Sequence, residues 1–288
     1  MQAEAESLGK GIGASIQPAA QDFLQNQRLA IASTVGSDRV LASALTGKPG
    51  FMQVVAEQIV RINAAIVPGH RFRENLLRQN DIGILAIDLA TRRRLRLNGK
   101  ADVQPDGLIY VHTKQVYFNC PKYIQTRYLD GDDKQPAVSQ LQTSQSLNRK
   151  QQQWISQADT FFIASFHPQG GADASHRGGY PGFVRISNHS QLVFPDYAGN
   201  NMFNTLGNIS IHPQTGLLFI DFERGSTLQL TGTAKILWDA VRVAEFAGAE
   251  RLVQFEIDQV VEISDAISLR WQFGEYSPFT VAVGRPAS

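Results

Sequence analysis

A repeat in the amino-acid sequence constrains the fold more than any other feature of this chain. Three blocks recur in the same order: residues 29–33 resemble 161–165, residues 43–51 resemble 175–183, and residues 82–101 resemble 215–234. The first two pairs are offset by 132 residues and the third by 133, with 8 of its 20 positions identical. A repeat on this scale predicts two copies of one structural unit. The alternative is that two β-rich segments share only generic strand chemistry.

Both halves are rich in strand patterns. In the second half, residues 161–166 and 216–222 are short apolar runs, residues 227–231 alternate, residues 192–194 end at a proline, and residues 252–263 form one long mixed stretch. Turn signals fall at Asp106-Gly107 and Arg224-Gly225. Short helices are predicted over 71–79, 122–128, 202–209 and a stretch starting near Ser146 or Asn148. This pattern favours a barrel or sandwich over a parallel βαβ sheet.

The repeat and the composition between its copies predict the domain organisation. We expect an N-terminal tail or docking helix over 1–20, a first repeat over 21–129, a linker over 130–153 and a second repeat over 154–288. The linker segment is poor in large apolar residues, which is typical of a connecting segment.

The composition excludes several broad classes of function. The chain has 288 residues, 43% of them hydrophobic, and 27 basic against 26 acidic residues. This near-neutral balance argues against binding nucleic acid or an anionic membrane over the whole surface. No apolar run approaches the roughly 20 residues of a membrane span. A single cysteine, Cys120, allows no intrachain disulfide, and the start of the chain lacks a secretory signal, so we expect a cytoplasmic protein.

Two segments of the second half suit an anion. Residues 194–208 read as a strand end, a polar turn with Gly199, Asn200 and Asn201, and a short helix whose N-terminus could bind phosphate. Residues 175–185 combine three glycines with Arg177 and Arg185, whose guanidinium groups match phosphate oxygens. The structural alternatives are an ordinary strand–turn–helix connection and a β-turn with surface arginines.

Two segments of the first half carry reactive or charged groups. Cys120 lies two residues from Lys122, which would favour a thiolate, but a buried structural cysteine fits the segment better than a nucleophile. Arg92, Arg94 and Arg96 share one face of a predicted strand, where they either meet an anion in a groove or face water; we favour water. The six histidines show no metal-ligand spacing, and no catalytic triad can be assigned, so no metal is predicted and the catalytic residues stay unknown.

These motifs together resemble a known family. SHRGGYPGFVRI, LVFPDYAGNNMFNTLGN, HPQTGLLFIDF and LQLTGTA in the second half resemble pyridoxamine 5′-phosphate oxidase-related FMN-binding proteins. LTGKPGF, GILAIDLATRRRLRLNG and NCPKYIQTR in the first half narrow the resemblance to the predicted flavin-nucleotide-binding branch. The resemblance implies a mainly β fold of two split β-barrels in tandem with a few short helices, with the flavin in a cleft between barrels.

The resemblance also implies which residues hold the flavin. Arg185, helped by Arg177 and the turn at 199–201, would bind the phosphate, while Phe194, Pro195 and Asp196 would border the isoalloxazine ring. The full set of implied cofactor-binding residues is Ser175, His176, Arg177, Arg185, Phe194, Pro195, Asp196, Gly199, Asn200, Asn201, Thr227, Lys122 and Trp271.

The first repeat lacks the Asn pair of this turn, so we expect one phosphate site, in the second repeat, with the first repeat forming the opposite wall. The expected function is that of an FMN-dependent oxidoreductase acting on an unknown small-molecule substrate or electron donor, as a homodimer or an intrachain pseudo-dimer. The alternatives are a flavin carrier or redox sensor, and a split barrel that binds haem or a deazaflavin.

Overall fold

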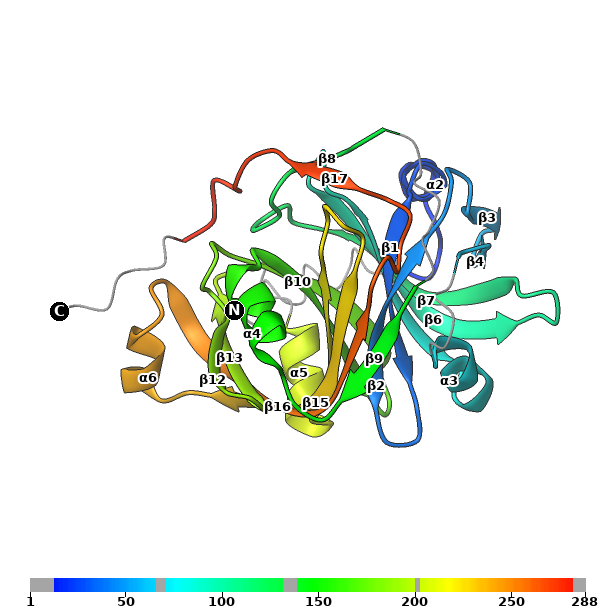
Figure 1. Ribbon diagram of the computed structural model, residues 1–288. Coiled ribbons are helices and arrows are strands. Elements are labelled where there is room, and N and C mark those ends of the chain that lie inside the picture. The colour runs from blue at the N-terminus through cyan, green and yellow to red at the C-terminus, as the bar shows by residue number, and fades with distance from the viewer. Residues whose placement is uncertain (1–12, 66–70, 132–138, 200–202, 282–288) are drawn as a thin grey trace, which may run out of the picture.

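The computed structural model describes residues 13–65, 71–131, 139–199 and 203–281, and its N-terminal part is one antiparallel sheet. The seven strands lie in the order β2-β1-β5-β6-β7-β4-β3 (Figure 1). Their bounds are β1 (Leu29–Val35), β2 (Val40–Thr46), β3 (Met52–Ala56), β4 (Ile59–Ile62), β5 (Asp81–Asp88), β6 (Arg93–Val103) and β7 (Ile109–Asn119). We call this the N-terminal sheet.

The second half of the chain forms a sheet with the same strand order. Seven of its strands follow β11-β10-β14-β15-β16-β13-β12, and β9 (Leu141–Ser144) pairs with β16 at its side. The bounds are β10 (Thr160–His167), β11 (Gly171–Gly178), β12 (Arg185–Asn188), β13 (Gln191–Tyr197), β14 (Gln214–Ile220), β15 (Thr227–Leu237) and β16 (Ala249–Ile263). We call this the C-terminal sheet. The predicted class, mainly β with a few short helices, is confirmed.

The helices are short, and α2 and α3 of the first half lie at places equivalent to α4 and α5 of the second half, whereas α6 has no counterpart. They are α2 (Pro18–Gln25), α3 (Phe72–Arg78), α4 (Arg149–Gln157), α5 (Asn204–Ile211) and α6 (Ala240–Ala244). The start of α4 is set by a capping box, in which the Asn148 side chain accepts from the backbone N–H of Gln151. The helix predicted over 122–128 is wrong: this segment is a turn, with φ of +66° at Tyr123, followed by strand β8 (Arg127–Leu129).

Strand β8 pairs with β17 (Trp271–Phe273) in a separate ribbon that crosses above both sheets (Figure 1). Each sheet has its own apolar core, and a third core lies between the sheets, with Ile31 and Leu85 from one sheet and Phe162 and Leu218 from the other. Burial of this third core removes apolar surface of both halves from water and holds the sheets together.

Two glycines at matching positions allow the sheets to approach closely. A Cβ on Gly83 would lie 2.5 Å from the backbone oxygen of Ala172, and a Cβ on Gly216 would lie 2.5 Å from that of Val40. Gly83 on β5 thus packs against edge strand β11, and the equivalent Gly216 on β14 packs against edge strand β2. The interface is therefore nearly symmetric about an axis between the two halves.

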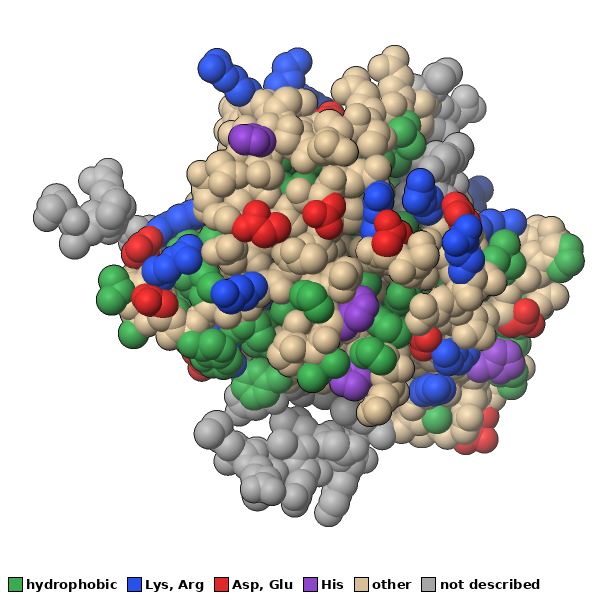
Figure 2. All heavy atoms as spheres, turned by 90° about the horizontal axis from the view of Figure 1, so that it is seen from below, with side chains coloured by type: hydrophobic (Ala, Val, Ile, Leu, Met, Phe, Trp, Pro, Cys, Tyr) green, Lys and Arg blue, Asp and Glu red, His purple; other side chains and the backbone are tan. Residues whose placement is uncertain are grey.

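The surface agrees with the balanced charge of the sequence. On the face shown in Figure 2, Lys and Arg side chains are interspersed with Asp and Glu side chains. Among the described residues, no helix is long and apolar enough to cross a membrane.

Candidate functional site

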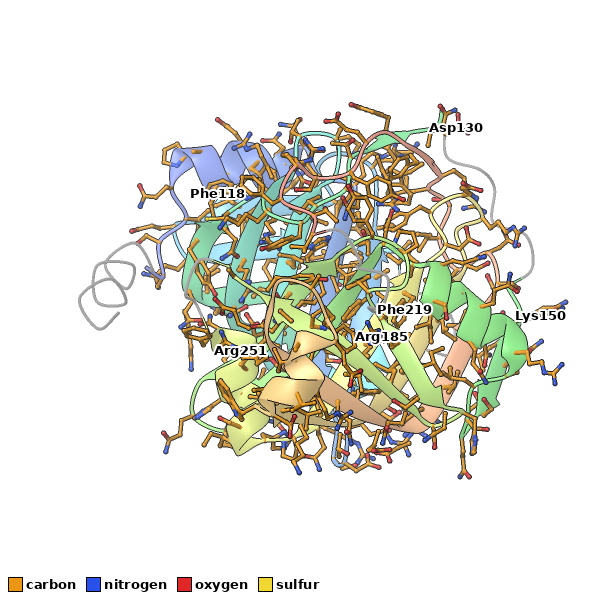
Figure 3. All side chains as sticks on the ribbon, turned by 90° about the vertical axis from the view of Figure 1, so that its left-hand side faces the viewer. Phe118, Asp130, Lys150, Arg185, Phe219 and Arg251 are labelled. Atoms are coloured by element: carbon orange, nitrogen blue, oxygen red, sulfur yellow. The ribbon has the colours of Figure 1, made fainter. Side chains whose placement is uncertain are left out.

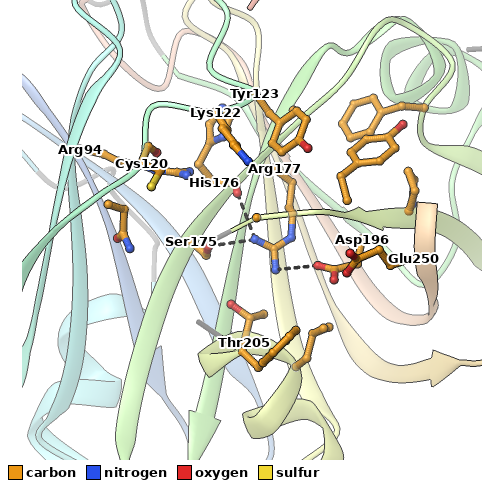
Figure 4. A pocket seen from close by; sticks show the side chains of 18 of the residues that line it. Arg94, Cys120, Lys122, Tyr123, Ser175, His176, Arg177, Asp196, Thr205 and Glu250 are labelled. Carbon is orange, nitrogen blue, oxygen red and sulfur yellow. Dashed lines mark hydrogen bonds and ion pairs between the residues drawn. The ribbon is translucent and has the colours of Figure 1, made fainter. Parts of the chain in front are cut away.

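A cavity of about 90 Å³ lies between the two sheets (Figure 4). One wall comes from the N-terminal sheet, with Arg94 and Arg96 on β6 and the segment 119–123 that follows β7. The other wall comes from the C-terminal sheet and α5, with Ser175, Arg177 and Thr205 among its residues. The cavity is therefore completed by both halves of a single chain.

One of the arginines in the cavity is fully neutralised. The Arg96 guanidinium reaches both carboxylate oxygens of Asp173 at 3.0 and 3.1 Å and donates to the Ser175 hydroxyl at 2.6 Å. Asn98 and Thr205 also donate to the Asp173 carboxylate. Both side chains of the ion pair are buried, and the charge of Asp173 keeps the pKa of Arg96 above its usual value against the opposing effect of burial.

The other two arginines keep excess positive charge. The Nε of Arg94 donates to the backbone oxygen of Cys120 at 3.0 Å, and among the described residues no carboxylate pairs with it. Burial, together with Arg96 and Arg177, lowers the pKa of Arg94 to about 9. Arg177 donates to Ser175 at 3.0 Å but lies 3.8 Å from its nearest carboxylate, Asp196, and burial lowers its pKa as well. A bound anion would stabilise both guanidinium groups.

His176 contributes a neutral imidazole to the cavity wall. Its side chain is 3% exposed, and neither ring nitrogen has a hydrogen-bond partner among the described residues. Burial and the nearby Arg94 hold the pKa of His176 well below 6.5. Since buried imidazole nitrogens are normally hydrogen-bonded, His176 is available to a ligand as one donor and one acceptor.

Aromatic and acidic side chains surround the mouth of the cavity. The rings of Tyr123 and Tyr197 lie 5.4 Å apart, and Phe203, at the start of α5, is 47% exposed. Asp196 and Glu250 line the same side, and burial raises the pKa of the Asp196 carboxyl. The cavity thus has a cationic interior and an aromatic rim with two carboxylates.

Seven of the thirteen residues predicted from the sequence line this cavity: Ser175, His176, Arg177, Pro195, Asp196, Gly199 and Lys122. Asn200 and Asn201 lie outside the described residues. The segment Asn119–Lys122 stands in the opposite wall, on the side of the N-terminal sheet.

Four predicted residues lie elsewhere. Arg185, on β12, pairs with Glu245 at 3.3 Å and stacks on the Phe246 ring at 3.9 Å, so its charge is already used away from the cavity (Figure 3). Phe194 points into the core of the C-terminal sheet. Thr227 is the first residue of β15 and does not line the cavity, and Trp271 packs edge-on against Phe222 at 5.4 Å.

Sequence reasoning missed Arg94 and Arg96. We expected the alternating arginines of this strand to face water, which is wrong for these two: Arg96 is 6% exposed and both line the cavity. The spacing correctly placed them on one face of a strand. The missing information was that the C-terminal sheet packs against that face.

The symmetry-related position in the other half carries no charge. Counting from the equivalent glycines Gly83 and Gly216, Arg96 corresponds to Gln229, and the strand registers make Asp173 correspond to Leu41. Gln229 reaches across the interface as Arg96 does, donating to the backbone oxygen of Ala42 at 2.6 Å. Neither a guanidinium nor its carboxylate is present at that position.

Fold and cavity together define a mainly β protein with an arginine-lined cavity between two similar sheets. Comparison with protein families gives a match for residues 147–270, to the family described as pyridoxamine 5′-phosphate oxidase. The matched segment contains the C-terminal wall of the cavity and excludes Arg94, Arg96 and residues 119–123. No curated protein matches the chain.

Several solved structures resemble part of the chain. HupZ from Group A Streptococcus has 11% identity and a TM-score of 0.32, and covers 38% of this chain and 90% of its own. HutZ, the haem storage protein from Vibrio cholerae, has 12% identity and a TM-score of 0.29, covering 38% and 89%. An FMN-binding protein from Syntrophomonas wolfei has 6% identity and a TM-score of 0.30, covering 38% and 80%.

The arrangement suits binding of a phosphate-bearing aromatic compound. Arg94 and Arg177, whose charges are not fully balanced by carboxylates, lie inside the cavity, and the aromatic rings of Tyr123 and Phe203 lie at its rim. Among the described residues, no group of three or more His, Cys, Asp or Glu side chains could hold a metal ion.

Proposed function

We propose that this chain binds one FMN between its two sheets and functions as an FMN-dependent oxidoreductase. The observation that carries the proposal is the pair of half-buried guanidinium groups in the cavity: Arg94 has no carboxylate partner among the described residues, and Arg177 lies 3.8 Å from its nearest carboxylate. The match of residues 147–270 to the oxidase family supports the same cofactor.

The residues of the cavity fit the phosphate end of FMN. A volume of about 90 Å³ is far below the 300–1,000 Å³ typical of sites that enclose a whole ligand, so the enclosed part takes a phosphate and not a three-ring system. Arg94, Arg177 and Lys122 would hold the phosphate, and Tyr123 and Phe203 at the rim would contact the ring. When bound, the flavin supplies the redox chemistry, while the chain binds and orients it.

A second copy of the chain is not required to complete this site. Arg94 comes from the N-terminal sheet and Arg177 from the C-terminal sheet of the same chain. The proposal is therefore an intrachain pseudo-dimer with one FMN per chain.

The test is a titration of the purified apoprotein with FMN, followed by flavin fluorescence. Arg94→Ala and Arg177→Ala should each weaken binding by about 1.5–3 kcal/mol, since each removes a charged hydrogen bond to phosphate. Arg185→Ala is the matched control and should bind normally, because Arg185 pairs with Glu245 outside the cavity. Normal binding in both cavity variants would refute the site.

Turnover distinguishes an enzyme from a flavin carrier or redox sensor. Bleaching of the flavin bands by NADH or NADPH, and their return with an electron acceptor, would support an oxidoreductase. Stable flavin binding without bleaching by any donor would support the carrier or sensor.

His176 favours haem as the second candidate ligand. Neither nitrogen of the buried His176 imidazole has a partner among the described residues, so it could ligate iron and the cavity arginines could meet the haem carboxylates. Since a haem exceeds the about 90 Å³ enclosed now, this candidate requires the two walls of the cavity to move apart. Adding haemin and recording a Soret band that His176→Leu shifts would support haem. A protein that takes up neither FMN nor haemin would refute both candidates.

A further inference from the structure

A second and larger cavity lies beside the β8–β17 ribbon. It has a volume of about 700 Å³ and is bordered by α4, the turn between β14 and β15, and the ribbon itself. This volume falls within the range of small-molecule sites. The FMN proposal uses none of its residues.

Four aromatic side chains from three different segments face this cavity. Trp154 comes from α4, Phe222 from the β14–β15 turn, and Trp271 and Phe273 from β17. Phe222 and Trp271 meet edge to face, with ring centroids 5.4 Å apart. Rings brought together from separate elements form walls on which a flat ligand can stack.

The cavity already holds one flat cation against these rings. The guanidinium of Arg127 lies 4.2 Å from the centroid of Phe222 and 5.7 Å from that of Phe273. Its charge is matched by Asp159, whose carboxylate accepts at 2.5 Å, and both side chains are buried. Arg127 therefore offers no free charge to an anion, and it shows that these ring faces accommodate a planar cation.

The remaining charges favour a cation as well. Apart from the Arg127–Asp159 pair, three carboxylates line the cavity against two cations: Asp221, Glu223 and Glu262 against Lys150 and Arg224. Lys150 extends from α4 away from the ribbon (Figure 3). With Arg96 likewise left out because Asp173 neutralises it, the first cavity has the opposite balance, with three cations and two carboxylates in its lining.

We propose that this second cavity is a binding site for a planar aromatic cation, such as an N-alkylated pyridinium or quinolinium ring. The ring stacks against Phe273, which is 46% exposed, the nearly buried Trp271 forms the wall beside it, and the acidic rim supplies the charge complement. The site is independent of FMN, so it stands even if the first cavity binds another ligand.

The tryptophans provide the assay. The chain has three: Trp154 and Trp271 border this cavity, whereas Trp238 lies outside it and is 68% exposed. In a Trp238→Phe protein, 1-methylquinolinium should therefore quench tryptophan fluorescence saturably. The anionic probe 2-naphthalenesulfonate should not. Linear, non-saturating quenching by 1-methylquinolinium, or equal affinity for both probes, would overturn the proposal.

Variants locate the bound probe. Phe273→Ala should weaken 1-methylquinolinium roughly tenfold, because it removes one stacking face. Phe273 is 46% exposed, so its truncation should leave the fold intact. Phe118→Ala is the matched control: Phe118 is 41% exposed, lies on β7, and should leave affinity unchanged.

A charge variant keeps the test decisive if Phe273→Ala folds poorly. Glu223 is exposed, so Glu223→Gln should fold normally and weaken the cationic probe several-fold at low ionic strength. Full affinity in Glu223→Gln together with full affinity in Phe273→Ala would place the probe elsewhere.

Discussion

The ion pair between Arg96 and Asp173 joins the two sheets, and its removal tests both the interface and the cavity. In Arg96→Gln the buried Asp173 carboxylate loses the guanidinium that reaches both of its oxygens. Among the described residues, Asn98 and Thr205 would be the donors left to it. Breaking a buried pair in this way costs about 3–5 kcal/mol, because one charge stays buried without its partner.

The repeat supplies the rescue variant. The corresponding residues at the symmetry-related position are Gln229 and Leu41, and Gln229 already satisfies its side chain on the backbone oxygen of Ala42. Arg96→Gln combined with Asp173→Leu copies that arrangement. Replacing a buried ion pair by well-packed residues is often neutral for stability. The free energy of unfolding of the double variant should therefore lie within about 1 kcal/mol of that of the unmodified chain.

Urea denaturation at neutral pH measures these differences. Arg185→Ala is the control for an exposed pair and should lose no more than about 1 kcal/mol. The reasoning is refuted if Arg96→Gln costs under about 1 kcal/mol, or if adding Asp173→Leu gives no recovery.

Three further predictions concern pH, anion binding and packing. The pKa of His176 is held well below 6.5 in the folded chain, so on acidification the unfolded chain takes up a proton that the folded chain does not. The contribution of the neutral imidazole to the free energy of unfolding is therefore complete above about pH 6.5. It is lost below that pH by up to about 1.4 kcal/mol per pH unit. His176→Leu should flatten this slope in calorimetry between about pH 6.5 and 5, and an unchanged slope would contradict the burial of a neutral imidazole. Asp196→Asn removes the carboxylate 3.8 Å from Arg177, so the cavity should bind sulfate roughly fivefold more tightly in a titration; weaker binding would show that Asp196 positions Arg177. Gly83→Ala places a Cβ 2.5 Å from the backbone of Ala172 and should cost about 1–3 kcal/mol in thermal unfolding, whereas Gly207→Ala, with open space around it, should not destabilise.

The repeat was readable from sequence because strand chemistry and turn glycines are local. Gly83 and Gly216 occupy equal places, and the strands after them match residue for residue. The match of 29–33 with 161–165 is one residue out of register: Gly83 pairs with Ser33, but Gly216 pairs with Ala164. Between equivalent paired positions the β10–β11 hairpin is one residue longer: Ala174 follows its partner Ala164 by ten positions, whereas Ala42 follows its partner Ser33 by nine. Identical letters in short apolar strands cannot reveal such a shift.

The cavity was less predictable, because it depends on which faces of the two halves meet. The prediction that Ser175 and Arg177 belong to the site rested on the glycines and arginines of their own segment, which is local information. Arg94 lines the cavity and Arg185 does not, for a long-range reason. Arg185 finds Glu245 some sixty residues away, in a segment that the first half lacks, while Arg94 is covered by the other sheet.

The difference between the two halves explains why one chain would hold one ligand. Where the C-terminal half has Arg177 and Thr205 beside the cavity, the N-terminal half has Leu45 and Phe72, both fully buried in its core. Burying such apolar side chains contributes about 1.5–3 kcal/mol each, whereas burying uncompensated guanidinium groups is unfavourable without a ligand. The apolar position in the N-terminal half therefore stabilises the fold, whereas the arginine-lined cavity destabilises it until a ligand binds there. An FMN titration monitored by unfolding temperature should saturate at one equivalent per chain, and saturation at two would mean that the apolar position also opens.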